Sequence, residues 1–210
     1  MLEATDGRSM RRSRNREAVV LAALELIRDH GRVPTMDEVA ERSGVSARSV
    51  FRYFDDSDDL VGAVVEEHRR RLMPLWEEGE RIDRSLPFAE RLDAFVTARV
   101  ALLEAMGPVA WVARVRAAEQ PVIAAELARV RAALRGQLAA LFAPELPSSD
   151  DGDAVLAAAD VLASWEAHDL LGHDHRLDRT AVRAAIATGL GRLLAPPVAT
   201  TTPNTRRRSR

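Results

Sequence analysis

The sequence predicts an all-helical protein of about nine helices, and three observations support this prediction. Apolar residues recur at spacings of three and four along most of the chain, and no segment alternates for long with a period of two. Alanine is abundant and clusters of β-branched residues are short, which favours helices over strands. Aromatic residues, which are also enriched in strands, make up only 4% of the 210 residues.

The first helix is predicted at about residues 15–30, where an apolar stripe runs along one face. The residues of this stripe are Val20, Ala23, Leu24 and Ile27. Gly31 is a suitable residue to end the helix. Residues 1–14 are expected to form a disordered basic arm, which can reach a minor groove of DNA or remain solvated.

Residues 35–54 predict two short helices joined by a glycine turn. Thr35 can cap the first of these, at 36–43, and Glu38 three residues on completes a capping box. Gly44 permits the turn, and the second helix ends near residue 54. Five residues at the start and along this second helix face outward, small ones first and basic ones further along: Ser46, Ala47, Arg48, Ser49 and Arg52. Such a face fits the major groove of DNA.

The remaining helices form a body. An acidic turn at 55–59 precedes a connecting helix at about 58–73, which Pro74 is expected to end or kink. Further helices are predicted at about 88–105, around Trp111 after a break at Gly107, and at 121–142, 153–171 and 178–194. The last two flank a charged loop at 172–176, and residues 197–210 are expected to be disordered. The predicted domains are therefore a head at 15–57 and a body at 58–196.

The charges are distributed unevenly between head and body. Residues 1–55 hold 10 arginines against 9 acidic residues, whereas residues 56–205 hold 16 against 23. Arginines are concentrated at 8–16. A basic front on an acidic body predicts contact with a polyanion through the front only, although an arginine cluster can also be merely solvated.

Several classes of protein are excluded by what the sequence lacks. There is no cysteine, which excludes a disulfide framework, a zinc–thiolate site and an iron–sulfur cluster. No apolar run reaches the roughly 18 residues of a membrane span, and no signal-type stretch opens the chain, so we expect a cytoplasmic protein. The glycine-rich and nucleophile-elbow motifs of common enzymes are missing, so we predict no enzyme and no cofactor. His168 and His173 do not share a helical face, so we predict no metal site.

The stretch REAVVLAALELIRDHG followed by TMDEVAERSGVSARSVFRYFDDSDDL resembles the N-terminal DNA-binding domain of the tetracycline-repressor (TetR) family. The resemblance covers about residues 16–65. It implies a homodimer on a palindromic operator and a small molecule that releases the DNA. It places base or phosphate contacts on seven residues: Thr35, Ser46, Ala47, Arg48, Ser49, Arg52 and Tyr53.

Two positions depart from the pattern of the family. Phe51 stands where the family commonly has tyrosine, and Asp58 stands where it commonly has a basic residue. Both changes remove expected contacts to the DNA backbone, for which Arg52, Tyr53 and the arginines at 8–16 can compensate. Phe51 and Phe54 are expected to lie in the core.

A ligand cavity is expected between the helices of the body, apolar with a few polar groups. The candidate lining residues are Phe95, Arg99, Leu103, Met106, Trp111, Leu127, Arg131, Trp165 and Asp169, although each apolar one can be plain core. If Arg99 and Arg131 are buried, each needs a partner, which can be Glu166, Asp169 or an anionic ligand. Both can also point at solvent.

Helices 153–171 and 178–194 carry apolar residues on more than one face and are the expected dimer interface. The sequence therefore predicts a ligand-responsive, sequence-specific DNA-binding transcriptional regulator, and a repressor rather than an activator. The alternative is a helical interaction protein that uses the head for a protein partner. A small helical enzyme is a third reading, for which no residue indicates a substrate.

Overall fold

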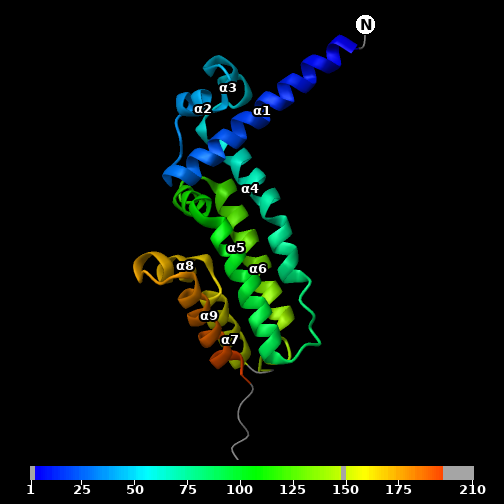
Figure 1. Cartoon of the computed structure of the whole chain (residues 1–210), viewed down its shortest axis with the longest axis vertical. Helices are drawn as coiled ribbons and strands as arrows, with labels where there is room; N and C mark the ends of the chain where they lie inside the picture. Colours follow the sequence, from blue (N-terminus) through cyan, green and yellow to red (C-terminus); the bar gives the residue numbers. More distant parts are fainter. Residues whose placement is uncertain (1–2, 148–149, 196–210) are drawn as a thin grey trace, which may run out of the picture.

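A computed structural model describes residues 3–147 and 150–195 of the chain; the predicted tail at 197–210 lies outside them. Within these residues the fold consists of helices and contains no strand, which confirms the all-helical prediction. The elements are α1 (Glu3–His30), α2 (Met36–Ser43), α3 (Ala47–Tyr53), α4 (Ser57–Glu80), α5 (Phe88–Arg116), α6 (Pro121–Leu141), α7 (Asp150–Leu162), α8 (Trp165–Asp169), the π-helix η1 (Leu170–Asp174) and α9 (Arg179–Leu194). Helices α1–α3 form the head at one end of an elongated molecule (Figure 1).

The predicted disordered arm at 1–14 is wrong for the residues that the structure describes, because α1 begins at Glu3. Helix α1 is anchored by residues of its second half, such as Leu24 and Ile27, which are buried in the head. No proline lies between Glu3 and this anchor, so a helix nucleated there continues toward the N-terminus. The N-terminal end of α1 projects beyond α2 and α3 (Figure 1).

The two short helices of the head form as predicted. The hydroxyl of Thr35 accepts a hydrogen bond from the Glu38 amide at 3.3 Å, and the Thr35 amide donates to the Glu38 carboxylate at 2.7 Å. This capping box provides a partner for an amide that has none within α2. Gly44 follows α2 with φ at 67°, a left-handed conformation that favours glycine.

Helix α4 joins the head to the far end of the body as one helix, so the prediction that it ends before Pro74 is wrong. A proline removes the hydrogen bond to the carbonyl four residues earlier, here that of Arg70. Both Pro74 and Arg70 lie on the exposed face of α4, where water can satisfy that carbonyl.

The predicted helix at 153–171 is divided in the structure. Helix α7 ends at Leu162, and the Ser164 side chain accepts a hydrogen bond from the Ala167 amide, which caps the separate helix α8. The π-helix η1 begins before the predicted loop and takes up part of it. A serine that caps a new helix competes with the continuous helix that the apolar pattern predicts.

The head and the body have separate hydrophobic cores that meet along α5. The head core contains buried residues of α1, α2, α3 and α4, together with Val109 and Val112 of α5. The body core lies between the first half of α5 and helices α6, α7 and α9. Gly107, with φ 37° and ψ −135°, breaks α5 between the two halves, as the sequence predicts.

The position of α5 also explains its hydropathy. Among the described helices it is the one that is long and apolar enough, by length and composition, to cross a membrane, and 50% of its apolar window is buried inside the fold. It carries the buried side chains of Arg91 and Arg99 and lies at the centre of the body. A helix surrounded by other helices is apolar on most of its faces, as α5 is.

Candidate functional site

The outward face of α3 carries most of the residues that the sequence assigns to DNA. Ser46, Arg48 and Arg52 are exposed, whereas Ala47, Ser49 and Tyr53 are half-buried. Helix α3 is held from behind by Val50 and the following Phe54, both buried in the head core. The face is therefore carried by a packed element.

Phe51 corrects one prediction and Phe54 confirms its counterpart. Phe54 is 1% exposed and belongs to the head core, but 55% of Phe51 is exposed, so Phe51 is not a core residue. Phe51 follows the buried Val50 directly, and the helical step of about 100° turns it away from the core. An aromatic side chain therefore stands on the same surface as Arg48 and Arg52.

The arginines of α3 have no acidic partner within the described part of the chain. Arg32 and Arg42, elsewhere in the head, pair with carboxylates, but Arg48 and Arg52 do not. The guanidinium of Arg52 lies over the ring of Tyr53, 5.4 Å from its centroid. Both positive charges of α3 thus remain available to an anion outside the protein.

Thr35 lies at the N-terminus of α2, and its exposed side chain is engaged in the capping box. Its hydroxyl donates to the Glu38 carboxylate at 3.0 Å, and Arg32 pairs with the same carboxylate at 2.5 Å. These contacts hold the pKa of Glu38 at about 2, with the Arg32 hydrogen bond as the largest cause. A phosphate at Thr35 would therefore lie beside a carboxylate that is already balanced by Arg32.

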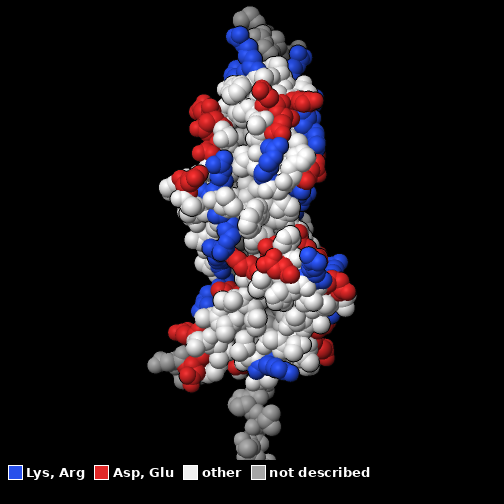
Figure 2. Space-filling model, turned by 90° about the vertical axis from the view of Figure 1, so that its left-hand side faces the viewer, with Lys and Arg blue, Asp and Glu red and all other residues white. Residues whose placement is uncertain are grey.

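Helix α1 adds further positive charge to the head. Arg11, Arg12 and Arg14 are exposed on it, and the guanidinium of Arg16 lies 4.8 Å from the centroid of Phe54. Figure 2 shows basic side chains at the head end of the molecule, with acidic ones directly below. The head therefore presents its positive charge toward its tip.

The nine residues predicted to line a ligand cavity do not meet in one place. Five of them line a cavity of about 360 Å³ between α5, α6, α7 and α8, which we call the arginine cavity. These five are Arg99, Met106, Leu127, Arg131 and Trp165. Leu103, Trp111 and Asp169, again with Trp165, line a wider cavity next to Gly107. Phe95 lines neither of these two cavities; it is packed in the body core, which is the plain-core alternative that the sequence left open.

The two predicted arginines have different partners. Arg131 pairs with Glu166, one of the proposed partners, and half of its side chain is exposed. Arg99 is 2% exposed and pairs with neither Glu166 nor Asp169. It donates instead to the carbonyls of Ala163 and Leu134 and to the amide oxygen of Gln137, at 3.1–3.2 Å. Burial lowers the pKa of Arg99 to about 10, which still leaves it charged at neutral pH.

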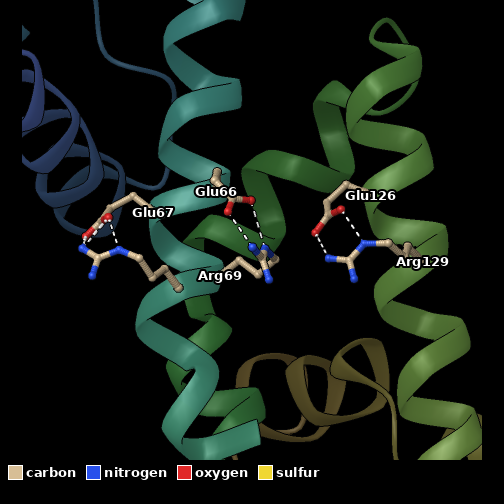
Figure 3. Close-up of polar contacts among 6 residues, drawn as sticks. Glu66, Glu67, Arg69, Glu126 and Arg129 are labelled. Atoms are coloured by element: carbon tan, nitrogen blue, oxygen red, sulfur yellow. Dashed lines mark hydrogen bonds and ion pairs between the residues drawn. The ribbon is translucent and has the colours of Figure 1, made fainter.

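A third cavity is lined by only two of the predicted residues, Met106 and Leu127. It has a volume of about 350 Å³, lies between α4, α5 and α6, and is mostly apolar; we call it the α4 cavity. Two of its lining residues, Arg69 and Arg129, pair with Glu66 and Glu126 at its edge (Figure 3). In the sequence, the apolar face of the connecting helix indicates burial, but it does not indicate that a cavity remains between this helix and its neighbours.

His68 lines the α4 cavity and is also missing from the sequence predictions. It is 5% exposed, its Nε2 lies 3.3 Å from the carbonyl oxygen of Met106, and its Nδ1 has no partner among the described residues. Burial is the largest cause that lowers the pKa of His68 to about 4, followed by the charge of Arg28. The ring is therefore neutral at pH 7, with Nε2 as the donor to Met106.

The histidine-rich segment does not assemble a metal site in the described part of the chain. There, no three side chains of histidine, aspartate or glutamate come together in a way that could hold an ion. His173 and His175 are exposed, while His168 is half-buried beside Trp165 in the cavity next to Gly107.

A helix-turn-helix head on a helical body defines a class of protein, and comparison with known proteins shows what the head is similar to. Residues 19–64 match the model of the bacterial regulatory proteins of the tetR family. Over 65 residues the chain is 43% identical to uncharacterized HTH-type transcriptional regulators from two strains of Mycobacterium tuberculosis. The match covers 29% of this chain and 28% of each relative. The head of the chain is thus similar to the regulatory proteins of the tetR family, and the chain matches about a quarter of the length of these relatives.

Solved structures extend the likeness to the body. A transcriptional regulator from Rhodococcus sp. Rha1 superposes with a TM-score of 0.67 at 21% identity, over 85% of this chain and 95% of that one. A tetR-family transcriptional regulator from Streptomyces coelicolor gives 0.65 at 19% identity, over 86% and 80%. At these identities the likeness shows the fold alone, over the part of the chain that superposes.

The burial of His68 predicts a pH dependence of stability. Because its pKa falls from 6.5 in the unfolded chain to about 4 in the fold, the unfolded chain binds the proton more readily. The stability that the neutral ring contributes is therefore present above about pH 6.5 and is lost as the pH falls toward 4. Between pH 7 and 4, we expect the free energy of unfolding to fall by about 3 kcal/mol more in the wild type than in His68→Gln.

Urea denaturation at intervals of one pH unit measures this difference. His168→Gln is the matched control, because His168 is less buried and its pKa is also lowered. Between pH 7 and 4, the free energy of unfolding of His168→Gln should differ less from that of the wild type than His68→Gln does. Parallel curves for the wild type and His68→Gln would contradict the prediction.

Proposed function

We propose that the chain is a ligand-responsive, sequence-specific DNA-binding transcriptional regulator that acts in the cytoplasm as a repressor. One observation carries the proposal: α3 exposes Arg48 and Arg52, with no acidic partner in the described chain, on a head that matches the tetR-family model. Arginine is the side chain that most often reads guanine in the major groove. Two arginines that are four residues apart on one helix, neither with an acidic partner, suit that role.

The α3 face divides its contacts between bases and backbone. We assign Arg48, near the N-terminus of α3, to a base contact, because recognition helices enter the groove with that end. Phe51 replaces a phosphate-binding hydroxyl with an apolar ring that can contact a thymine methyl group. Arg52 and the exposed arginines of α1 then supply the phosphate contacts that the phenylalanine has lost.

Two copies of the chain are proposed to pair through α7 and α9. The apolar residues Val182, Ile186 and Leu190 of α9 are buried within one chain and do not supply this surface. Small residues one and two turns apart on α7 are exposed instead: Ala154, Ala157, Ala158 and Val161. Small side chains permit close approach of two helices, as in a four-helix bundle. Figure 2 shows a broad area without charged side chains on this side of the body.

A ligand in the body is proposed to control the spacing of the two heads. Helix α4 begins in the head and lines the α4 cavity in the body, so it is the element that a ligand can tilt. Such control requires that the ligand binds the two head spacings with different affinity, typically by about 1–3 kcal/mol. A repressor is released from its operator when the ligand favours the spacing that does not fit.

Selection of genomic fragments by the purified protein tests the proposed function. At moderate salt, a sequence-specific regulator should enrich a few fragments, and footprinting should reveal a palindrome in them. Retention should fall steeply with salt, because the contacts release counterions. No enrichment, with binding that salt does not weaken, would favour a head that binds a protein partner.

Arg48→Ala is predicted to weaken binding to the selected fragment about tenfold or more, while binding to random DNA changes little. Titration of labelled DNA at fixed salt measures both affinities. Arg84→Ala, an exposed arginine between α4 and α5, is the matched control and should leave both unchanged. An equal loss on the two DNAs would make Arg48 a phosphate contact only.

The proposed dimer predicts a mass of twice 23.1 kDa in solution. Ala157→Glu should shift the protein to the mass of one chain, since it places a charge on each side of the interface. Sedimentation velocity measures the mass. Ala140→Glu, at an exposed alanine of α6, should not change it. A monomeric wild type, or a dimer that survives Ala157→Glu, would count against this interface.

A further inference from the structure

The arginine cavity holds an unusual concentration of positive charge. Three guanidinium groups line it: Arg99 and Arg114 from α5 and Arg131 from α6. Two acidic residues also line it, Asp160 of α7 and Glu166 of α8. Asp160 lies 3.7 Å from a fourth arginine, Arg135, so its charge is shared with a group outside the lining.

Arg99 lacks a carboxylate partner although it is the most buried of these arginines. Its three hydrogen bonds go to two backbone carbonyls and one amide oxygen. A guanidinium has five N–H groups, so these bonds do not saturate it. Its face lies against the ring of Phe95, with the central carbon 4.7 Å from the ring centroid. The charge of Asp160 also acts on Arg99 but forms no ion pair with it, so the buried guanidinium gains from an anion in direct contact.

Glu166 shows that a carboxylate fits between the other two arginines. A single oxygen of Glu166 accepts hydrogen bonds from both Arg114 and Arg131. Two cations therefore share one acid, at a position where all three side chains are partly exposed. A ligand carboxylate can take this position, or join it, without any new type of contact.

The remaining wall of the arginine cavity is apolar. It includes Met106, Ala110, Leu127, Val130 and Leu134, together with the ring of Trp165. The volume of about 360 Å³ lies within the range of small-molecule sites. Charged groups at one side and an apolar wall at the other fit an amphipathic molecule with one charged end and one apolar end.

We propose that the arginine cavity binds an amphipathic monocarboxylate, with its carboxylate held by Arg99, Arg114 and Arg131 and its apolar chain on the wall of Met106 and Leu127. The proposal rests on the proposed function, because it assigns the chemical class of the effector. Glu166 acts as an internal competitor that occupies two of the arginines when the ligand is absent.

The cavity is placed to act on the head. Met106 and Ala110 lie on either side of the break at Gly107 and belong to the walls of both the arginine cavity and the α4 cavity. Val109 and Val112, on the same short segment of α5, are packed in the head core. The apolar chain of a ligand that displaces Met106 and Ala110 would therefore also displace Val109 and Val112, which are packed in the head core.

Isothermal titration calorimetry with octanoate and octanamide tests the proposal in the absence of DNA. The two probes share one alkyl chain and nearly one shape, but only octanoate is charged at pH 7.5. We expect octanoate to bind about tenfold more tightly, because charge-assisted hydrogen bonds to arginine are made by octanoate alone. Equal affinities, or no heat from either probe, would overturn the proposal.

Two substitutions at one contact should act in opposite directions. Glu166→Gln removes the competing charge and is expected to raise octanoate affinity about fivefold, whereas Arg131→Gln should lower it about fivefold. Neither should change octanamide binding. Failure of Glu166→Gln to strengthen octanoate binding would overturn the role of Glu166 and with it the proposal.

Matched controls come from a surface ion pair at the C-terminal end of α4. Glu77 and Arg81 pair on the surface and line none of the cavities described above, so Glu77→Gln and Arg81→Gln should leave octanoate affinity unchanged. Thermal unfolding of each variant verifies its fold. Because no DNA is present, a chain that fails to select DNA can still bind octanoate. A chain that selects DNA can likewise fail to bind octanoate, so the two proposals can fail separately.

Discussion

The packing of Val109 and Val112 between α1 and α4 is the contact on which the coupling of head and body depends. Both valines come from the short segment of α5 that follows Gly107, and both are buried with residues of the head. The other links between head and body are α4 itself and the packing of Val33 against the cluster of Val61, Ala113 and Ile123. With Val109 and Val112, the orientation of the head is fixed by two helices, each of which also lines a cavity in the body.

The break at Gly107 makes that packing possible. A straight α5 would continue along the axis of the body, whereas the break redirects its second half into the head core. The backbone of Gly107 is not helical, and the carbonyl of Met106 just before it lies within hydrogen-bonding distance of His68 on α4. His68 in its neutral state therefore contacts the break in α5 and also lines the α4 cavity. Head, break and cavities thus form one connected region of the molecule.

Sequence patterns predicted the parts of the fold that depend on local chemistry. The capping box at Thr35, the left-handed Gly44 and the break at Gly107 each follow from the residues next to them. The start of α1 and the passage of α4 through Pro74 were missed, because packing at a distance and access of water decide them. The predicted cavity residues were partly correct for the same reason: periodicity tells which residues are buried, but not which gaps between helices stay open.

The coupling of head and body can be measured most directly by hydrogen exchange on Val109→Ala. Removing two methyl-sized groups from a site that is 4% exposed should cost about 2 kcal/mol. Val100→Ala is the matched control, since Val100 is equally buried on the same helix but belongs to the body core. We predict that Val109→Ala speeds exchange in the second half of α1, which lies in another part of the sequence, and that Val100→Ala does not. Faster exchange confined to α5 in both variants would contradict a junction built on Val109 and Val112.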